Sequence, residues 1–169
     1  KIKSSLEEKN ISVKFDNRDK FKPGFKFNEY ELKGVPLRIA IGPNDLENET
    51  VEVARRDDLS KTLVNQNEVV HHVEHCLKEI QALLFNKAQI FRDKNITKVD
   101  NFEEFKKVLN NKGGFISAHW DGTDLTEQAI KKITKATIRC IPLDCEEESG
   151  KCVYSGKDSN RRVLFAKAY

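Results

Sequence analysis

The sequence predicts an α/β protein, α+β overall, made of two small modules joined by a long helix. Three observations support this fold class. Short runs with apolar residues at every second position alternate with runs of helical spacing, and glycine and proline stand between them. A third, much longer run keeps helical spacing from Asn67 to about Asp93 and separates the two sets. Each set is therefore expected to form a layered module of helices on a sheet.

The first half begins with Ile2 and Leu6, whose spacing predicts the last turns of a helix that ends at Asn10. Gly34 is expected to end a second helix, and Asp57 lies in the turn of a hairpin. Because helix, strand, helix and strand follow one another, the sheet is expected to be parallel. The expected elements are a helix over residues 1–9, a strand over 11–15, a helix over 25–33, a strand over 36–41 and a hairpin of 50–56 with 61–64.

In the second half, helix starts are predicted at Asp100 with Glu103 and at Asp124 with Glu127, because an acceptor followed three residues later by glutamate is a capping signal. Strands are expected over residues 115–120, 137–141 and 163–166, with helices over 101–112 and 124–135 between them. The expected core of this module comprises Phe102, Phe105, Phe115, Trp120, Ile130, Ile133, Ile138, Ile141, Val163 and Phe165.

Composition excludes several classes of protein. The chain has 169 residues and 19.4 kDa, is 38% apolar and 34% charged, and has a mean hydropathy of −0.63. No apolar run approaches the roughly 20 residues of a membrane-spanning helix. The first residues do not form a secretory signal, so the cytoplasm is the expected location and the four cysteines are expected to be free thiols. A net charge of +3 gives no ground, by itself, for predicting RNA binding.

Several loop and strand segments resemble one known family. They are DNRD (residues 16–19), PGFKF (23–27), ELKGVPLR (31–38), IGPND (41–45), FISAHW (115–120), TIRCIP (137–142) and the terminal RVLFAKAY (162–169). Together they resemble the prolyl-tRNA synthetases, specifically those of the archaeal and eukaryotic-like branch. The resemblance implies a class IIa anticodon-binding domain with a mixed sheet over residues 1–95, incomplete at its N-terminus, and a small α/β C-terminal domain over residues 96–169.

The resemblance also implies a function and its limits. The parent enzyme, a proline–tRNA ligase, activates proline with ATP and Mg²⁺ and transfers it to tRNA(Pro). The class II catalytic motifs belong to an upstream domain, so this fragment is expected to be inactive alone. The parent is expected to be a homodimer through that catalytic domain. Two alternatives stay open: a free-standing anticodon-domain-like RNA-binding module without catalysis, and a metal-sensing or metal-storage domain.

Residues of the first domain are implied to read the anticodon, which contains two guanines in every proline tRNA. Glu31 would accept from the guanine amino and imino groups, and Arg38 would donate to O6 and N7. Asp45 would serve the second guanine. Asn44 departs from the lysine or arginine of many relatives, although its amide can still donate. The alternative for each residue is an ordinary surface ion pair, worth about 0 to 1 kcal/mol.

Two further groups accompany these residues. Phosphate contacts would be sequence-independent and salt-dependent. The candidates for phosphate contacts are Lys26, Lys33, Arg55, Arg56 and Lys61. Phe25, Phe27 and Tyr30 are candidates either for stacking on bases or for core packing. The terminal Tyr169 is implied to fold back toward the catalytic domain.

Metal sites are not expected. His71 and His75 lie at helical spacing but on the solvent side, whereas Cys76 turns toward the apolar side. Cys140 is expected to pack as a small apolar residue.

Many relatives hold a structural zinc with four cysteines in the C-terminal domain. Here those positions are Asp121, Thr126, Cys152 and Ser155, so only one thiolate remains and zinc is expected to be absent.

Overall fold

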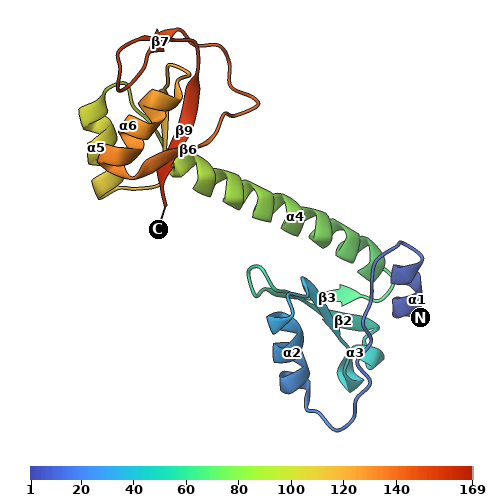
Figure 1. Cartoon of the computed structure of the whole chain (residues 1–169). Helices are drawn as coiled ribbons and strands as arrows, with labels where there is room; N and C mark the ends of the chain where they lie inside the picture. The colour runs from blue at the N-terminus through green and yellow to red at the C-terminus, as the bar shows by residue number, and fades with distance from the viewer. Residues whose placement is uncertain (169) are drawn as a thin grey trace. The chain divides into compact units, whose positions relative to one another are not determined.

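The computed structural model describes residues 1–168, and the prediction for Tyr169 lies outside the described residues. The chain divides into two compact units, Lys1–Asn86 and Lys87–Tyr169 (Figure 1). Within residues 1–168, no helix has both the length and the apolar character that a bilayer crossing requires. The α/β fold class predicted from the sequence is confirmed.

The first unit contains a three-stranded sheet with helices around it. Its elements are α1 (Ile2–Glu7), α2 (Pro23–Leu32), β1 (Leu37–Ala40), α3 (Pro43–Glu47), β2 (Thr50–Arg55), β3 (Lys61–Asn65) and the part of α4 (Val69–Lys94) that ends at Asn86. The strand order is β1-β2-β3, and both pairings are antiparallel, so the expected parallel sheet is wrong here. Residues 41–49 connect β1 to β2, and they are fewer than the dozen or so that a parallel crossover needs.

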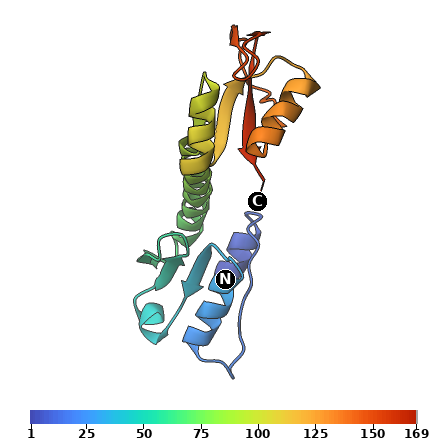
Figure 2. The same cartoon turned by 60° about the vertical axis from the view of Figure 1, so that its left-hand side comes forward.

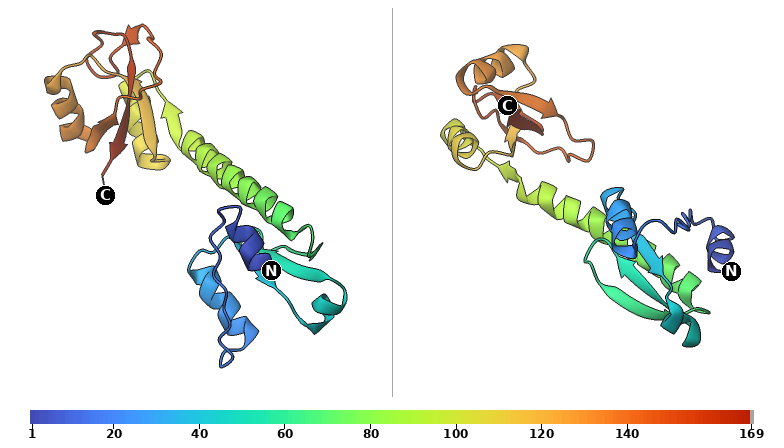
Figure 3. Two further views of the ribbon diagram at one scale, coloured as in Figure 1. Left: turned by 90° about the vertical axis from the view of Figure 1, so that its right-hand side faces the viewer. Right: turned by 90° about the horizontal axis from the view of Figure 1, so that it is seen from below.

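The two faces of this sheet have different neighbours. Val51, Val53 and Val64 are buried on one face, together with Val69 and Val73 of α4. The register pairs Arg38 with Ala54 across β1 and β2, on the other face. Helix α2 lies along the sheet there (Figure 3). Alternation along the strands thus separates the core from the face that carries the predicted site.

Residues 11–15 do not form the predicted strand. In the described part of the chain no strand pairs with them, although Ile11 and Val13 still pack against the core and Phe15 is 65% exposed. Period-two alternation specifies which side chains face inward, but a strand also requires a neighbouring backbone to pair with. The preceding helix ends as predicted, with Asn10 in the left-handed conformation at φ 59°.

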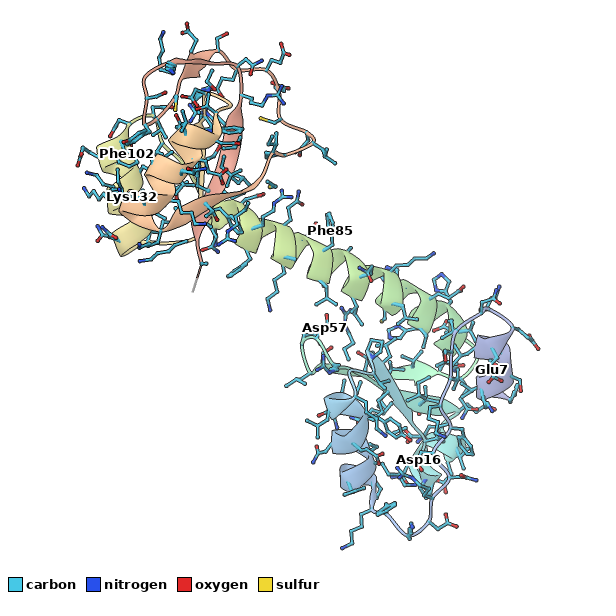
Figure 4. All side chains as sticks on the ribbon, viewed as in Figure 1. Glu7, Asp16, Asp57, Phe85, Phe102 and Lys132 are labelled. Atoms are coloured by element: carbon cyan, nitrogen blue, oxygen red, sulfur yellow. The ribbon has the colours of Figure 1, made fainter. Side chains whose placement is uncertain are left out.

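Helix α4 confirms the long helical pattern. It buries Val69, Val73, Cys76 and Ile80 at spacings of three and four residues. From residue 81 to residue 94 its side chains are exposed. Phe85 of this segment is 62% exposed (Figure 4).

The second unit contains a mixed four-stranded sheet. Its elements after α4 are β4 (Ile96–Lys98), α5 (Phe102–Asn111), β5 (Phe115–His119), α6 (Asp124–Thr134), β6 (Ala136–Cys140), β7 (Gly150–Lys151), β8 (Asp158–Ser159) and β9 (Arg162–Lys167). The strand order is β4-β5-β9-β6, with β4 and β5 parallel and the other pairs antiparallel. Helices α5 and α6 lie beside this sheet (Figure 2). Strand β7 pairs with β8 in a separate two-stranded sheet.

Most of the predicted core of this unit is confirmed. Phe105, Ile130, Val163 and Phe165 are fully buried, while Phe102, Trp120 and Ile138 pack partly buried against them. Phe115, Ile133 and Ile141 are 40%, 53% and 45% exposed, so their predicted burial is wrong. Phe115 precedes the buried Ile116 and therefore points to the opposite side of the strand.

Cys140 is exposed, so its predicted core position is also wrong. It lies at the end of β6, an edge strand of the sheet, just after a shift in register between Ile138 and Cys140. A register shift disturbs the inward and outward alternation on which the prediction rested.

Both helix starts lie one residue from the predicted caps. Asn101, not Asp100, accepts from the Glu104 N–H at 2.8 Å, and Thr123 caps α6. Asp and Asn are equally good N-caps, so a tertiary contact decides whether Asp100 or Asn101 caps α5. Asp100 instead forms an ion pair with the buried Arg162.

Arg162 connects several segments of the second unit. Its side chain is 8% exposed and donates to the carbonyls of Val99 at 3.0 Å and Ser117 at 3.3 Å, and to Asp100. Glu148 accepts from Nε at 3.0 Å and from Nη2 at 3.2 Å. This guanidinium, with help from Lys98, lowers the pKa of Glu148 to about 2. All three guanidinium nitrogens of Arg162 thus have acceptors.

We predict that Gly150→Ala destabilises the second unit, because an added Cβ would overlap the ring of His119, which is only 3% exposed. Overpacking a rigid neighbour should lower the free energy of unfolding by about 1–3 kcal/mol, measured by urea denaturation. Gly24→Ala is the control, since nothing lies within 4 Å of a Cβ there. Equal stability of the two variants would contradict the prediction.

Candidate functional site

Glu31 and Arg38 line the same small hollow in the first unit, one from α2 and the other from β1. The hollow has a volume of about 20 Å³. Its lining comprises Phe27, Tyr30, Glu31, Val35, Arg38, Ala54, Arg55 and Arg56. This volume is about that of one water molecule, so a nucleobase cannot enter it. A base could contact these side chains only from above the opening of the hollow.

The guanidinium of Arg38 is held against an aromatic ring and is incompletely hydrogen-bonded. Its central carbon lies 3.5 Å from the centroid of the Phe27 ring, within the range of a cation–π contact. Nη1 is 3.5 Å from Glu52 Oε1, and the side chain is 17% exposed. Within residues 1–168, its buried Nε and Nη1 atoms have no hydrogen-bond partner. Unsatisfied buried donors are costly, so Arg38 has donor capacity that a ligand acceptor could use.

Glu31 lines the same hollow as Arg38. The Glu31 carbonyl accepts from Arg56 Nε at 2.7 Å, which ties the end of α2 to the hairpin. The carboxylate itself forms no ion pair or hydrogen bond within the described residues. An acceptor and a donor with free capacity therefore lie on one hollow.

Asp45 and Asn44 lie elsewhere, on α3, and neither lines this hollow. Asp45 Oδ2 accepts from the Gly42 N–H at 2.7 Å, and Oδ1 accepts from Thr50 Oγ1 at 3.4 Å. Its carboxylate thus holds the start of α3. Asn44 is exposed, so its side-chain amide can reach solvent.

The five basic candidates differ in how firmly they are held. Arg55 donates to Asp57 through Nε at 3.1 Å and Nη2 at 2.9 Å, and to Glu79 of α4 at 2.9 Å. Its side chain is only 15% exposed. The Arg55 guanidinium lowers the pKa of Asp57, the residue labelled in Figure 4. Arg55 therefore acts mainly as a tie between the hairpin and α4.

The lysines are held more loosely. Lys33 and Lys61 are 58% and 56% exposed and pair with Glu29 at 2.6 Å and Glu52 at 3.4 Å. Lys26 contacts the Asp16 carbonyl at 3.4 Å. Exposed ion pairs contribute about 0–1 kcal/mol, so a phosphate can displace the partners of Lys33 and Lys61.

Sequence reasoning missed a charged cluster in the loop before α2. Arg18 Nη2 donates to Asp16 Oδ2 at 2.7 Å and to Glu29 Oε2 at 2.6 Å. The Arg18 hydrogen bonds hold the pKa of Asp16, which is labelled in Figure 4, well below its usual range. The DNRD string contains two of these residues, but it does not reveal the third partner on α2. This cluster fixes the loop against the helix that carries Glu31.

Two family models match the chain. The anticodon binding domain matches residues 1–75, and the prolyl-tRNA synthetase C-terminal domain matches residues 102–169. The chain matches the C-terminal portion of the prolyl-tRNA synthetases.

The chain is also similar to individual proteins, and these agree with the match. It is 62% identical over 168 residues to the proline–tRNA ligase of Flavobacterium johnsoniae, covering 99% of this chain and 34% of the relative. The ligase of Flavobacterium psychrophilum is 63% identical over 166 residues, which are 98% of this chain and 34% of that protein. The ligase of Cytophaga hutchinsonii is 55% identical over 168 residues, with 99% and 34% covered. The chain thus spans about a third of the length of these bacterial relatives.

The four positions that correspond to a zinc site in many prolyl-tRNA synthetases lie together here, joined by hydrogen bonds. Asp121 Oδ2 accepts from Thr126 Oγ1 at 2.8 Å and from Ser155 Oγ at 2.6 Å. The Ser155 N–H is 3.5 Å from Cys152 Sγ. Asp121 Oδ1 also accepts from the N–H and hydroxyl of Thr123. One thiol, one carboxylate and two hydroxyls do not fit the Cys and His set of a structural zinc.

The charge of Asp121 is stabilised by this network. Burial acts to raise its pKa, but the hydrogen bonds from Ser155, Thr126 and Thr123 outweigh burial and lower the pKa to about 2. The carboxylate therefore joins the loop after β5, the start of α6 and the turn at Ser155.

The histidines of α4 are dispersed around the helix. Cys76 is 3% exposed, whereas the His75 side chain is 64% exposed and lies 3.4 Å from Glu79. His71 is exposed, and His72 Nε2 contacts Cys76 Sγ at 3.4 Å. Among residues 1–168, no three His, Cys, Asp or Glu side chains are grouped as metal ligands.

We predict that Asp121→Asn lowers the free energy of unfolding at pH 7 by about 1–2 kcal/mol, because an amide cannot accept all four hydrogen bonds. The folded-state pKa of about 2 lies below the ordinary 3.8. The stabilisation is therefore present above pH 4 and is lost as the pH falls toward 2. Urea denaturation from pH 7 to pH 2.5 measures it.

The control for this prediction is Asp144→Asn, because Asp144 is exposed and has no polar side-chain partner within residues 1–168. If Asp121→Asn is as stable as Asp144→Asn at pH 7, or if its stability deficit does not shrink in acid, the role given to Asp121 is wrong.

Proposed function

We propose that this chain recognises the anticodon of tRNA(Pro) and provides C-terminal support within a proline–tRNA ligase. The whole ligase activates proline with ATP and transfers it to tRNA. The observation that carries the proposal is the hollow of Glu31 and Arg38, within the stretch that matches an anticodon binding domain. The 62% identity to a complete ligase supports it further.

Guanine recognition follows from the chemistry of this hollow. The free Glu31 carboxylate accepts from the imino and amino groups of guanine, and the accessible part of the Arg38 side chain, which is 17% exposed, supplies donors for O6 and N7. The base lies over the opening of the hollow, because a volume of about 20 Å³ cannot hold it. Phe27 keeps the guanidinium in place, since it lies 3.5 Å from the ring centroid. Recognition then requires little side-chain reordering.

Asn44 and Asp45 contribute at a separate position on α3. The exposed Asn44 amide is able to contact a second base or a phosphate. Asp45 supports that contact by holding α3 through Gly42. Phosphates are held by Lys26, Lys33, Arg56 and Lys61, while Arg55 contributes at longer range because its nitrogens are occupied.

The remainder of the proposal concerns the whole enzyme. ATP and Mg²⁺ act in the catalytic domain, and this portion alone is inactive. The enzyme is a cytoplasmic homodimer that associates through that domain. It belongs to the archaeal and eukaryotic-like branch, a proposal supported by the match of residues 102–169 to the additional C-terminal domain.

Two structural points complete the proposal. The domain boundary lies between residues 95 and 96, supported by the end of α4 at Lys94. Zinc is absent from the C-terminal domain, supported by the two hydroxyls that donate to Asp121.

We predict that Arg38→Ala in the complete ligase reduces discrimination between tRNA(Pro) and anticodon-guanine variants by about 1–3 kcal/mol, as expected for loss of a bidentate arginine–guanine contact. The ratio of kcat/KM for the two tRNAs measures it. Arg139→Ala is the control, because Arg139 is an exposed residue of β6 in the second unit. Unchanged discrimination by Arg38→Ala would refute the assignment.

Lys33→Ala is expected to act differently. It should weaken binding of all tRNA variants alike and reduce the slope of log K against log salt by about 1, since a phosphate contact carries no sequence information. Filter binding at several salt concentrations measures the slope. A loss confined to one anticodon sequence would show that Lys33 reads a base instead.

A further inference from the structure

A second, larger hollow lies entirely within the second unit. Its volume is about 580 Å³, within the range of small-molecule sites. The walls come from the loop after β5, the residue after β6, and the β7 and β8 segments with the turn before β9. The lining comprises Trp120, Asp121, Gly122, Ile141, Ser149, Gly150, Asp158, Ser159, Asn160 and Arg161.

The walls of this groove are fixed by internal contacts. Trp120 Nε1 donates to the Thr123 carbonyl at 3.2 Å, which orients the indole. His119, 3% exposed, lies behind the groove with Nδ1 at 3.1 Å from Ser159 Oγ. Gly150 lies so close to the His119 ring that a Cβ does not fit. A groove with fixed walls loses little entropy when a ligand binds.

Among the described residues that line the groove, Arg161 is the one cation, and Asp121 and Asp158 are the two carboxylates. The Asp121 carboxylate accepts four hydrogen bonds from its own neighbours. Asp158 is paired with Lys151. Arg161 is exposed, and within residues 1–168 its side chain contacts only Asn160 Oδ1, at 3.5 Å. The carboxylates are thus already engaged, whereas the guanidinium has no anionic partner.

We propose that this groove binds a nucleotide, with the base against Trp120 and the phosphate on Arg161. An indole and an adjacent guanidinium are the groups that proteins use for unstacked nucleotides. Ser149 and Asn160 add uncharged hydrogen-bonding groups beside them. A free nucleotide and a nucleotide of single-stranded RNA share this chemistry. The RNA source rests on the proposed function, since the parent enzyme handles tRNA.

The only tryptophan of the chain makes the groove observable. Titration of the 169-residue chain with AMP, with adenosine and with a short single-stranded oligonucleotide should quench Trp120 fluorescence for each phosphorylated probe. Adenosine should bind at least about tenfold more weakly than AMP, as loss of a charge-assisted hydrogen bond implies. Tighter quenching by the oligonucleotide than by AMP would identify RNA as the source, and the reverse would identify the free nucleotide.

Arg161→Ala should weaken AMP binding by about tenfold. Arg139→Ala is the matched control, because this exposed arginine does not line the groove. Circular dichroism of each variant checks that the unit is folded. Absence of quenching at millimolar AMP, or equal affinity of Arg161→Ala and Arg139→Ala, would overturn the proposal.

This test is independent of anticodon recognition. The first unit contains no tryptophan, so RNA binding at Glu31 and Arg38 does not directly change the signal. If Arg38→Ala loses anticodon discrimination but no probe quenches Trp120 fluorescence, the proposed function stands. Only the proposed nucleotide site in the groove is then refuted. If a peptide with a free carboxylate quenches Trp120 fluorescence as strongly as AMP does, the proposal that the groove is a nucleotide site is contradicted.

Discussion

A guanidinium buried away from water needs a hydrogen-bond acceptor for each of its donors. The two units differ in how far a buried arginine meets this requirement. In the second unit, Arg162 meets it completely: the carbonyls of Val99 and Ser117 and the carboxylates of Asp100 and Glu148 occupy all three nitrogens. Such a residue holds a fold together. In the first unit, Arg38 does not meet it, because Nε and Nη1 form no hydrogen bond within residues 1–168, although Glu52 lies 3.5 Å from Nη1. The same side-chain chemistry thus supports architecture in one unit and, in our proposal, recognition in the other.

The second unit also shows how a hydrogen-bonded carboxylate can connect loops. Asp121 accepts from three hydroxyls and one backbone N–H, and they come from segments up to 34 residues apart. A structural metal supplies more binding free energy but needs deprotonated ligands. The Asp121 network needs only that its carboxylate remain ionised, which a pKa of about 2 ensures at neutral pH.

The sequence could predict those features that depend on local pattern. The burial of Val73 and Cys76 follows from helical spacing, and the left-handed Asn10 and Gly34 follow from helix endings. Features that depend on partners were missed. The N-cap of α5 is Asn101 and not the predicted Asp100, because Asp100 pairs with Arg162. No local signal in the sequence reveals a partner 62 residues away.

In the candidate site, too, some features could be predicted from the sequence and others depend on tertiary partners. Family resemblance named Glu31 and Arg38, and the structure places them on one hollow. The resemblance did not reveal that Phe27 lies against Arg38 or that Glu52 is the carboxylate neighbour of Arg38. The Glu52 contact depends on the antiparallel register of β1 and β2, and the Phe27 contact depends on the packing of α2 against β1. The small volume of the hollow is likewise a property of packing and has no signature in the sequence.

The position of β9 has a consequence for biosynthesis. Among the strands of its sheet, β9 is the last to be translated, yet it lies between β5 and β6 and pairs with both. The first unit has consecutive antiparallel strands, so it can assemble while the ribosome is still working. The second sheet cannot close until β9 leaves the exit tunnel, and until then the edges of β5 and β6 remain open to chaperones or to aggregation.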